Sequence, residues 1–203
     1  MKNETKILGI ILLLISNISI NSMSKEEQKY EYGNTTLINA VFNNSLEDVE
    51  NLLNQGVDVN LKNDCGNTAL MIAAAKGNIE MLGIMIHLGK ADLNSQDCYG
   101  HTPLMWAIVK GHLEIVKILI NEGAYINIQN NEGRTALIYA VGENNKDMVR
   151  VLIAANADLN IKDHMGKTAL MYALERNSNN IIEILTEYTH LVSIFKEVIT
   201  SEK

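Results

Sequence analysis

The chain has 203 residues, of which 47% are hydrophobic and 20% charged, so it has enough apolar material for a folded core and too little charge for a disordered protein. Its formal net charge of −7 argues against nucleic acid or an anionic membrane as a partner, because both need clustered Lys and Arg. A single proline and an aromatic content of 5% favour a helical protein over a β-sandwich or barrel.

The N-terminus has the pattern of a secretory signal peptide. Lys2 and Lys6 precede an apolar stretch at 7–15, and a polar segment follows it. The stretch is shorter than the roughly 20 residues that a membrane-spanning helix requires, so an uncleaved anchor is the weaker alternative. The abundance of Asn, Ile and Lys is typical of an AT-rich bacterium. We therefore expect an exported bacterial protein, periplasmic or secreted.

Small residues place the cleavage site after Ser22, with Ser19 as the alternative. Residues 1–22 are then the signal peptide, and residues 23–30 are a linker or an N-terminal cap. We expect no membrane contact after cleavage.

A unit of about 33 residues recurs through the rest of the chain. A Gly-x-Thr motif reappears at intervals of 33, 34, 33 and 33 residues, and the longer interval contains one extra residue, Lys90. The threonines are Thr35, Thr68, Thr102, Thr135 and Thr168. A fixed period of this length indicates stacked structural units.

Each unit predicts two short helices. The Gly supplies a positive φ for a turn, and the Thr hydroxyl caps a first helix such as TALMIAAA at 68–75. The second helix carries apolar pairs three residues apart, as in Ile115-Val116 and Ile118-Leu119, which make one buried face. We expect it to end at a residue suited to the left-handed conformation: Gly56, Gly89, Gly123 or Asn156.

Other recurring polar residues are interpreted as structural. Asn78, His112, Asn145 and Ser178 fall where the second helix needs an N-cap. Asp58, Asp92 and Asp158 recur in one turn, where an Asp side chain bonds local backbone N–H groups. These carboxylates are therefore not expected to form a catalytic row.

The pattern resembles the ankyrin repeat. GHTPLMWA at 100–107, GH at 111–112 and GAYIN at 123–127 match the signature of that family within one unit. The resemblance covers about residues 31–189. One departure is systematic: in every repeat an apolar residue replaces the signature His. We expect the packing of this residue to take the place of the His. The replacements are Ile38, Met71, Met105, Ile138 and Met171.

The resemblance implies an all-α solenoid of about five stacked helix-turn-helix repeats. The repeats are expected at about 31–63, 64–97, 98–130, 131–163 and 164–189. Apolar residues at helical spacing in 190–203 predict a C-terminal capping helix over the end of the stack.

No pattern of enzyme chemistry accompanies the repeats. The histidines lack the i, i+4 spacing with a Glu that a zinc hydrolase helix needs, and the chain has no Cys-x-x-Cys, G-x-S-x-G or phosphate-binding glycine loop. We therefore expect no catalytic, cofactor-binding or metal site.

Two further sets of residues allow two interpretations. Cys65 and Cys98 lie on successive turns, where export would permit a disulfide, but helix-packing distances of about 10 Å favour free thiols. Trp106, Tyr139 and Tyr172 occupy equivalent places in three first helices. They could form a stacking platform for a sugar or base, but the place is an interior one in the family, which favours packing between repeats.

The resemblance implies that partners contact the turns beside each Gly and the exposed end of the first helix. The corresponding residues vary in chemistry from copy to copy, unlike the helical faces. They are Tyr32, Asn34, Asp64, Asn67, Lys76, Tyr99, His101, Lys110, Glu132, Arg134, Glu143, His164, Met165, Lys167 and Arg176.

The leading functional hypothesis is a non-catalytic, monomeric module that binds a protein partner through this face. Its rigid frame would leave little ordering entropy to overcome. The alternative is a dedicated stabilising, inhibitory or immunity subunit of one envelope enzyme.

Overall fold

The computed structural model describes residues 29–31 and 34–188. A short antiparallel ribbon of β1 (Lys29–Glu31) and β2 (Asn34–Thr35) precedes the helices. The predicted signal peptide at 1–22 and capping helix at 190–203 lie outside these residues, as does most of the 23–30 segment.

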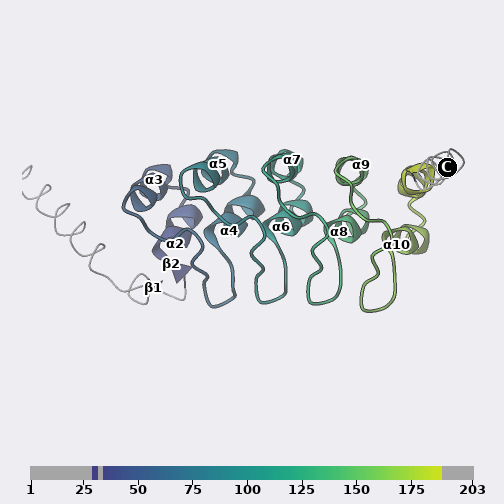
Figure 1. The fold of residues 1–203 in the computed structure, drawn as a ribbon, viewed down its shortest axis with the longest axis horizontal. Coiled ribbons are helices and arrows are strands. Elements are labelled where there is room, and N and C mark those ends of the chain that lie inside the picture. Colours follow the sequence, from purple (N-terminus) through teal and green to yellow (C-terminus); the bar gives the residue numbers. More distant parts are fainter. Residues whose placement is uncertain (1–28, 32–33, 189–203) are drawn as a thin grey trace, which may run out of the picture.

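The helices form two layers that run along the molecule, as Figure 1 shows. The first helices make one layer: α2 (Thr36–Phe42), α4 (Ala69–Lys76), α6 (Pro103–Val109), α8 (Ala136–Gly142) and α10 (Ala169–Glu175). The second helices make the other: α3 (Leu46–Asn54), α5 (Ile79–His87), α7 (Leu113–Asn121), α9 (Lys146–Ala154) and helical residues 179–188. Long turns extend from the first-helix layer. The predicted all-α stack of five repeats is confirmed.

Each first helix from α4 onward begins as predicted, at a Thr cap. The hydroxyl oxygen of the Thr accepts the backbone N–H three residues later, at 3.3 to 3.4 Å. The four caps are Thr68, Thr102, Thr135 and Thr168. The glycine two residues earlier has φ between +75° and +78° in these four turns. Both features are local, so they follow from the sequence of one repeat alone.

One predicted N-cap residue stands at the expected position but makes no capping bond. Asn78 and Asn145 cap their helices through side-chain oxygens, but the imidazole of His112 makes no bond to its own helix. Its Nε2 instead lies 3.1 Å from the carbonyl oxygen of Ala75, in the preceding repeat. His112 therefore links two repeats, because its ring reaches the unpaired carbonyls at the end of α4.

The end of α5 also differs from its prediction. Gly56, Gly123 and Asn156 adopt the left-handed conformation, but Gly89 does not, and the inserted Lys90 has φ +53° instead. Gly89 is needed for space, since a Cβ there would lie 2.9 Å from the carbonyl oxygen of Met85. The extra residue therefore lengthens the loop and takes over the left-handed turn.

The core lies between the layers and between successive repeats. Leu70, Leu104 and Leu137 of the first helices are at most 1% exposed. A small residue three positions further on lets neighbouring helices approach, and all four examples are fully buried: Ala73, Ala107, Ala140 and Ala173. Stacking therefore covers apolar faces that a single repeat would leave open.

Apolar packing replaces the signature His in four repeats. Ile38, Met71, Met105 and Ile138 are at most 3% exposed, and the Met71 thioether also accepts the N–H of Thr68 at 3.5 Å. Met171 is 44% exposed, so the prediction of packing is wrong there. It belongs to α10, which has no following first helix among the described residues.

None of the helices that the structure describes combines the length and apolar character needed to cross a bilayer.

Candidate functional site

The candidate site is the turn face. We define it as the turns that precede the capping Thr residues, together with the residues four and eight positions after each Thr. Each turn is held by one Asn or Asp. The Oδ1 atom of Asp97 accepts the backbone N–H groups of Tyr99 at 2.9 Å and His101 at 2.8 Å. Equivalent pairs of bonds are made by Asn63, Asn130 and Asp163. The turns are therefore rigid before any partner arrives.

Backbone hydrogen bonds join each turn to the next. The N–H of Asn131 donates to the carbonyl oxygen of Tyr99 at 3.0 Å, and that of His164 donates to Glu132 at 3.0 Å. Gln96 adds a side-chain bond, because its Nε2 donates to the carbonyl oxygen of Gln129 at 3.1 Å. The turns therefore form one continuous surface.

The same contact corrects the argument about the cysteines. The N–H of Cys98 donates to the carbonyl oxygen of Cys65 at 3.0 Å, so helix-packing distances do not separate these turns. Both thiols are free and exposed in the structure. The expected state is found, but the distance given as its reason is wrong, because turns approach more closely than helix axes do.

The structure places the three aromatic residues at the edge of the predicted interior. Trp106, Tyr139 and Tyr172 are half-buried on the turn face, with their polar atoms bonded to the turns. The Trp106 Nε1 donates to Asp97 at 3.1 Å, and the Tyr172 hydroxyl donates to Asp163 at 2.5 Å. Tyr139 and Tyr172 pack against the core, as predicted, but none of the three side chains is fully buried, because each has an apolar body and a polar tip that reaches a turn.

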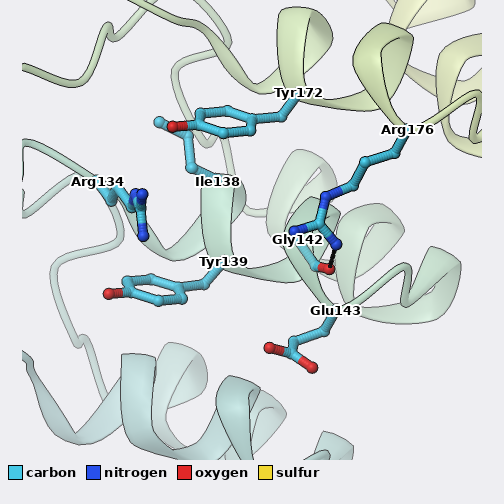
Figure 2. Close-up of a pocket in the computed structure, with 7 residues that line it drawn as sticks. All are labelled: Arg134, Ile138, Tyr139, Gly142, Glu143, Tyr172 and Arg176. Atoms are coloured by element: carbon cyan, nitrogen blue, oxygen red, sulfur yellow. Dashed lines mark hydrogen bonds between the residues drawn. The ribbon is translucent and has the colours of Figure 1, made fainter. Parts of the chain in front are cut away.

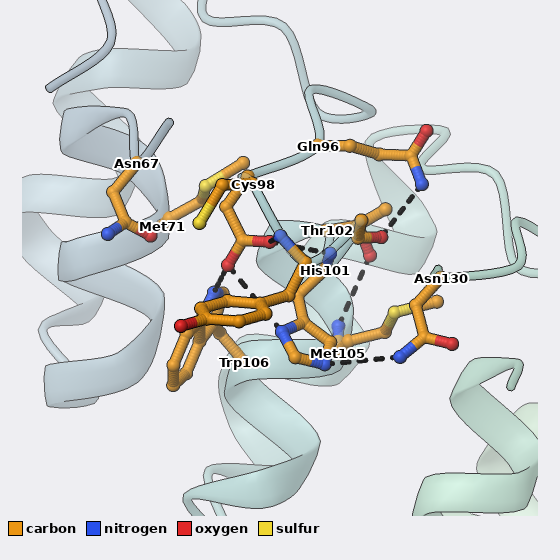
Figure 3. Close-up of polar contacts among 12 residues, drawn as sticks. Asn67, Met71, Gln96, Cys98, His101, Thr102, Met105, Trp106 and Asn130 are labelled. Atoms are coloured by element: carbon orange, nitrogen blue, oxygen red, sulfur yellow. Dashed lines mark hydrogen bonds and ion pairs between the residues drawn. The ribbon is translucent and has the colours of Figure 1, made fainter. Parts of the chain in front are cut away.

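His101 connects two repeats on this face. Its Nε2 lies 2.7 Å from the Tyr139 hydroxyl, and its Nδ1 lies 3.5 Å from the carboxylate of Asp97. Asn130 donates to the same hydroxyl at 2.9 Å. Figure 3 shows His101 between Trp106 and Asn130. Burial raises the pKa of Tyr139, with the charge of Glu132 adding to the effect, so the hydroxyl stays protonated.

Arg134 occupies the equivalent place one repeat later. Its Nη1 lies 2.8 Å from the Glu132 carboxylate, and its Cζ lies 5.9 Å from the centre of the Tyr172 ring. Burial lowers the pKa of Arg134, but the bond with Tyr172 and the charge of Glu132 outweigh burial and raise it. The guanidinium is therefore a fixed positive charge on the turn face.

Two small slots open between consecutive aromatic residues. The aromatic slot, about 160 Å³, is lined by His101, Met105, Trp106, Val109 and Tyr139. The guanidinium slot, about 140 Å³, lies one repeat further, and Figure 2 shows its lining side chains. They are Arg134, Ile138, Tyr139, Gly142, Glu143, Tyr172 and Arg176. The two slots occupy equivalent places but offer different chemistry.

The structure places thirteen of the fifteen predicted partner-binding residues on the turn face. The exposed ones are Asp64, Lys76, Tyr99, Lys110, Glu132, Glu143, His164, Met165 and Arg176, and the half-buried ones are Asn67, His101, Arg134 and Lys167. Tyr32 lies outside the described residues, and Asn34 is placed only as part of β2.

Some of these side chains already bind within the stack. Lys76 donates to the carbonyl oxygen of Phe42 at 2.9 Å, and Arg176 donates to that of Gly142, so each caps the first helix of the preceding repeat. Lys167 lies 2.7 Å from the Glu175 carboxylate. Tyr99 and Met165 remain 64% and 62% exposed.

Sequence reasoning missed the residues that support the face. Asp97, Asn130 and Asp163 are at most 7% exposed, and they hold both the turns and the aromatic residues. A signal existed, because Asn or Asp recurs five residues before the capping Thr in every repeat from Thr68 onward. Among the described residues, no group of three or more His, Cys, Asp or Glu side chains is arranged to hold a metal ion.

Replacing Asp163 with Asn should make the stability of the fold less dependent on pH in the acidic range. Burial raises the pKa of Asp163, but bonds from Tyr172 and from the backbone N–H groups of Lys167 and Met165 outweigh it and lower the pKa below 3.8. A carboxyl group whose pKa is lower in the folded state than in the unfolded state stabilises the fold at pH values above its unfolded-state pKa. This stabilisation is lost as the pH falls through its folded-state pKa.

We therefore expect the free energy of unfolding to fall more steeply in the wild type than in Asp163→Asn as the pH is lowered below about 5. Asn130, which donates to Tyr139 in the neighbouring repeat, shows that Asn fits this place. Urea unfolding at a series of pH values measures the difference, with Glu143→Gln as the control for losing an exposed carboxylate. Parallel profiles for the wild type and Asp163→Asn would contradict the expectation.

A family model described as ankyrin repeats (3 copies) matches residues 37–130 and 122–194. The crystal structure of EF0377, an ankyrin repeat protein, is similar at a TM-score of 0.75 and 37% sequence identity, over 83% of this chain and 87% of that one. A search of curated protein sequences gives no match.

Proposed function

The chain belongs to the ankyrin repeat family, and from this premise we propose that it is a non-catalytic module that binds a protein partner through its turn face. Ankyrin repeat domains are generally protein-binding modules and are typically non-catalytic. What we propose for this chain in particular is the surface through which it binds its partner.

The observation that carries the proposal is a pair of large apolar side chains exposed on rigid turns. Tyr99 and Met165 are 64% and 62% exposed, although the backbone around them is bonded to Asp97 and Asp163. Tyr and Met are enriched at protein interfaces, and a preorganised frame loses little entropy on binding. This combination supports protein binding at the turn face.

Crosslinking followed by affinity recovery from the native envelope tests the proposal. Tyr99→Ala should reduce recovery of the principal partner by more than about tenfold, because truncating an interface aromatic anchor costs roughly 2 kcal/mol or more. Tyr125→Ala is the matched control, since Tyr125 is 69% exposed but lies outside the turn face. Equal recovery with both variants would refute the choice of face. Recovery of one stoichiometric enzyme would instead support the dedicated-subunit alternative.

We also propose that the protein is exported. The support is the charged and apolar pattern of residues 1–15 and the small residues before position 23. The intact mass of the protein recovered in the same experiment should match a chain that begins at residue 23 or 20. A mass that includes residues 1–22 would contradict cleavage.

A further inference from the structure

The aromatic and guanidinium slots share one wall. Tyr139 lines both, with Trp106 across the first slot and Tyr172 across the second. The slots are related by the step of one repeat, which for packed helices is about 8 to 10 Å. A ligand that fills both must therefore present two side chains at about this separation, on the same side of its backbone.

The aromatic slot fits an apolar side chain. Trp106, Tyr139, Met105 and Val109 surround it, and the polar atoms of the two rings are bonded to the turns. The Nε2 of His101 is bonded to the Tyr139 hydroxyl, while its Nδ1, 3.5 Å from the Asp97 carboxylate, makes no hydrogen bond. An apolar side chain would therefore gain burial without breaking a hydrogen bond of the slot.

The guanidinium slot fits a carboxylate. Arg134 and Arg176 bring two positive charges to its lining, where Glu143 is the one carboxylate, although Glu132 also pairs with Arg134 from outside the lining at 2.8 Å. Arg176 donates to the Gly142 carbonyl oxygen and is exposed, and a guanidinium has five N–H donors, so others can reach a ligand. Glu143 is also exposed, so water screens its repulsion.

Charged residues of the turn face outside the guanidinium slot also favour an acidic ligand. The residues just before the capping Thr and eight positions after it carry five cations and one anion, although the whole chain has a net charge of −7. The cations are Lys76, Lys110, Arg134, Lys167 and Arg176, and the anion is Glu143. The turns themselves also carry the acidic residues Asp64, Asp97, Glu132 and Asp163, so the positive charge is concentrated at these two positions rather than over the whole turn face.

The separation of the slots selects a backbone conformation. In a polyproline II helix, residues i and i+3 point to the same side and lie about 9 Å apart, which matches one repeat. In a β-strand, residues on one side lie about 7 Å or about 13 Å apart, and neither spacing matches. A segment in the polyproline II conformation can therefore fill both slots.

We infer that the turn face binds an extended, polyproline II segment of the partner, with an apolar side chain in the aromatic slot and an Asp or Glu three residues away in the guanidinium slot. This inference rests on the proposed function and adds the chemistry and spacing that the partner segment must have. Either chain direction satisfies the geometry, so the acidic residue can precede or follow the apolar one.

Fluorescence polarisation with synthetic peptides tests the inference. The probes are two fluorescein-labelled peptides in a Gly-Ser host, one containing Leu-Pro-Pro-Glu and one containing Glu-Pro-Pro-Leu. At least one should bind saturably to the full-length protein. Replacing Glu with Gln, or Leu with Ser, in that probe should weaken binding by about tenfold, as expected for losing a charge-assisted hydrogen bond or a buried side chain. A third Pro, which breaks the spacing, should have a similar effect.

Gly142→Leu provides a blocking variant that should still fold. Gly142 lines the guanidinium slot within α8, and a Cβ there would meet no atom within 4 Å, so the added side chain fills the slot rather than the core. Gly83→Leu is the matched control, because Gly83 is also helical with nothing within 4 Å of an added Cβ and lies in α5. Gly142→Leu should weaken probe binding at least about tenfold, and Gly83→Leu should leave it unchanged.

Glu143→Gln separates charge recognition from shape. It should tighten binding of the Glu probe by about twofold, because it removes a like charge. Binding of the matching Gln probe should not change. Absence of saturable binding by both probes, or equal binding of the Glu and Gln forms, would overturn the inference. If Gly142→Leu still recovered the partner while Tyr99→Ala did not, the inference would fail and the proposed function would stand.

Discussion

Replacing Gly100 with Ala should destabilise the protein by about 3 kcal/mol, which sums the cost of a left-handed Ala and the cost of overpacking. Gly100 has φ +78°, a conformation that costs an L-residue with a Cβ about 1 to 2 kcal/mol. A Cβ there would also lie 2.7 Å from the backbone nitrogen of Asn131 and 2.9 Å from the Cα of Asn130. Those atoms belong to the next turn, so the bonded turns would have to separate.

Gly111→Ala distinguishes the two contributions. Gly111 has φ +80°, but a Cβ there would meet nothing within 4 Å. We expect it to cost only the conformational part, about 1 to 2 kcal/mol. Urea unfolding measures both variants, and Gly100→Ala should also lower the denaturant dependence, because weaker coupling between repeats reduces cooperativity. Equal losses would show that the contact between turns adds nothing to stability.

Replacing Asp97 with Ala should cost about 3 kcal/mol or more, since each buried donor left without a partner costs about 1 to 3 kcal/mol. The carboxylate accepts the backbone N–H groups of Tyr99 and His101 and the indole N–H of Trp106. Asp97 is 7% exposed, so water cannot fully replace these bonds. Trp106 is the single tryptophan of the chain, and its fluorescence should report the loosened side chain by shifting to longer wavelength.

Asp97→Asn is the matched control for this prediction. Asn130 holds the turn of the next repeat in the same way, since its Oδ1 accepts the N–H groups of Glu132 and Arg134 at 3.0 and 2.8 Å. Asp97→Asn should therefore keep both turn bonds and lose only the bond from the Trp106 indole, because an amide nitrogen cannot accept it. We expect a cost of about 1 to 3 kcal/mol, that of one buried donor left unpaired, and less than the cost of Asp97→Ala. Urea unfolding monitored by Trp106 emission compares the variants. Equal destabilisation by Ala and Asn would mean that charge, rather than hydrogen bonding, holds the turn.

Features that depend on nearby residues could be predicted before any coordinates were known. The Thr caps, the left-handed glycines and the Asp58 turn each involve bonds over four residues or fewer. The period of the Gly-x-Thr motif then implied stacking, because one repeat cannot bury its own apolar face. The set of residues on the turn face followed from the resemblance to the family.

Several of the predictions that failed required contacts between repeats. His112 binds Ala75, which lies 37 residues earlier, instead of capping its own helix. Met171 is exposed because its helix is the last of its layer among the described residues. The repeat pattern treats all copies as equivalent, so it cannot show which copy ends the layer or which side chain crosses to a neighbour.

The sequence alone determined the repeat, its two helices and the turn residues that differ between copies, because periodicity and capping act within a few residues. Only the tertiary structure left Trp106, Tyr139 and Tyr172 half-buried on the turn face, brought His101 against Tyr139 and opened the two slots between these rings. The bond between His101 and Tyr139 joins residues 38 positions apart. Such a contact forms only when stacking sets the distance between repeats, which no single repeat encodes.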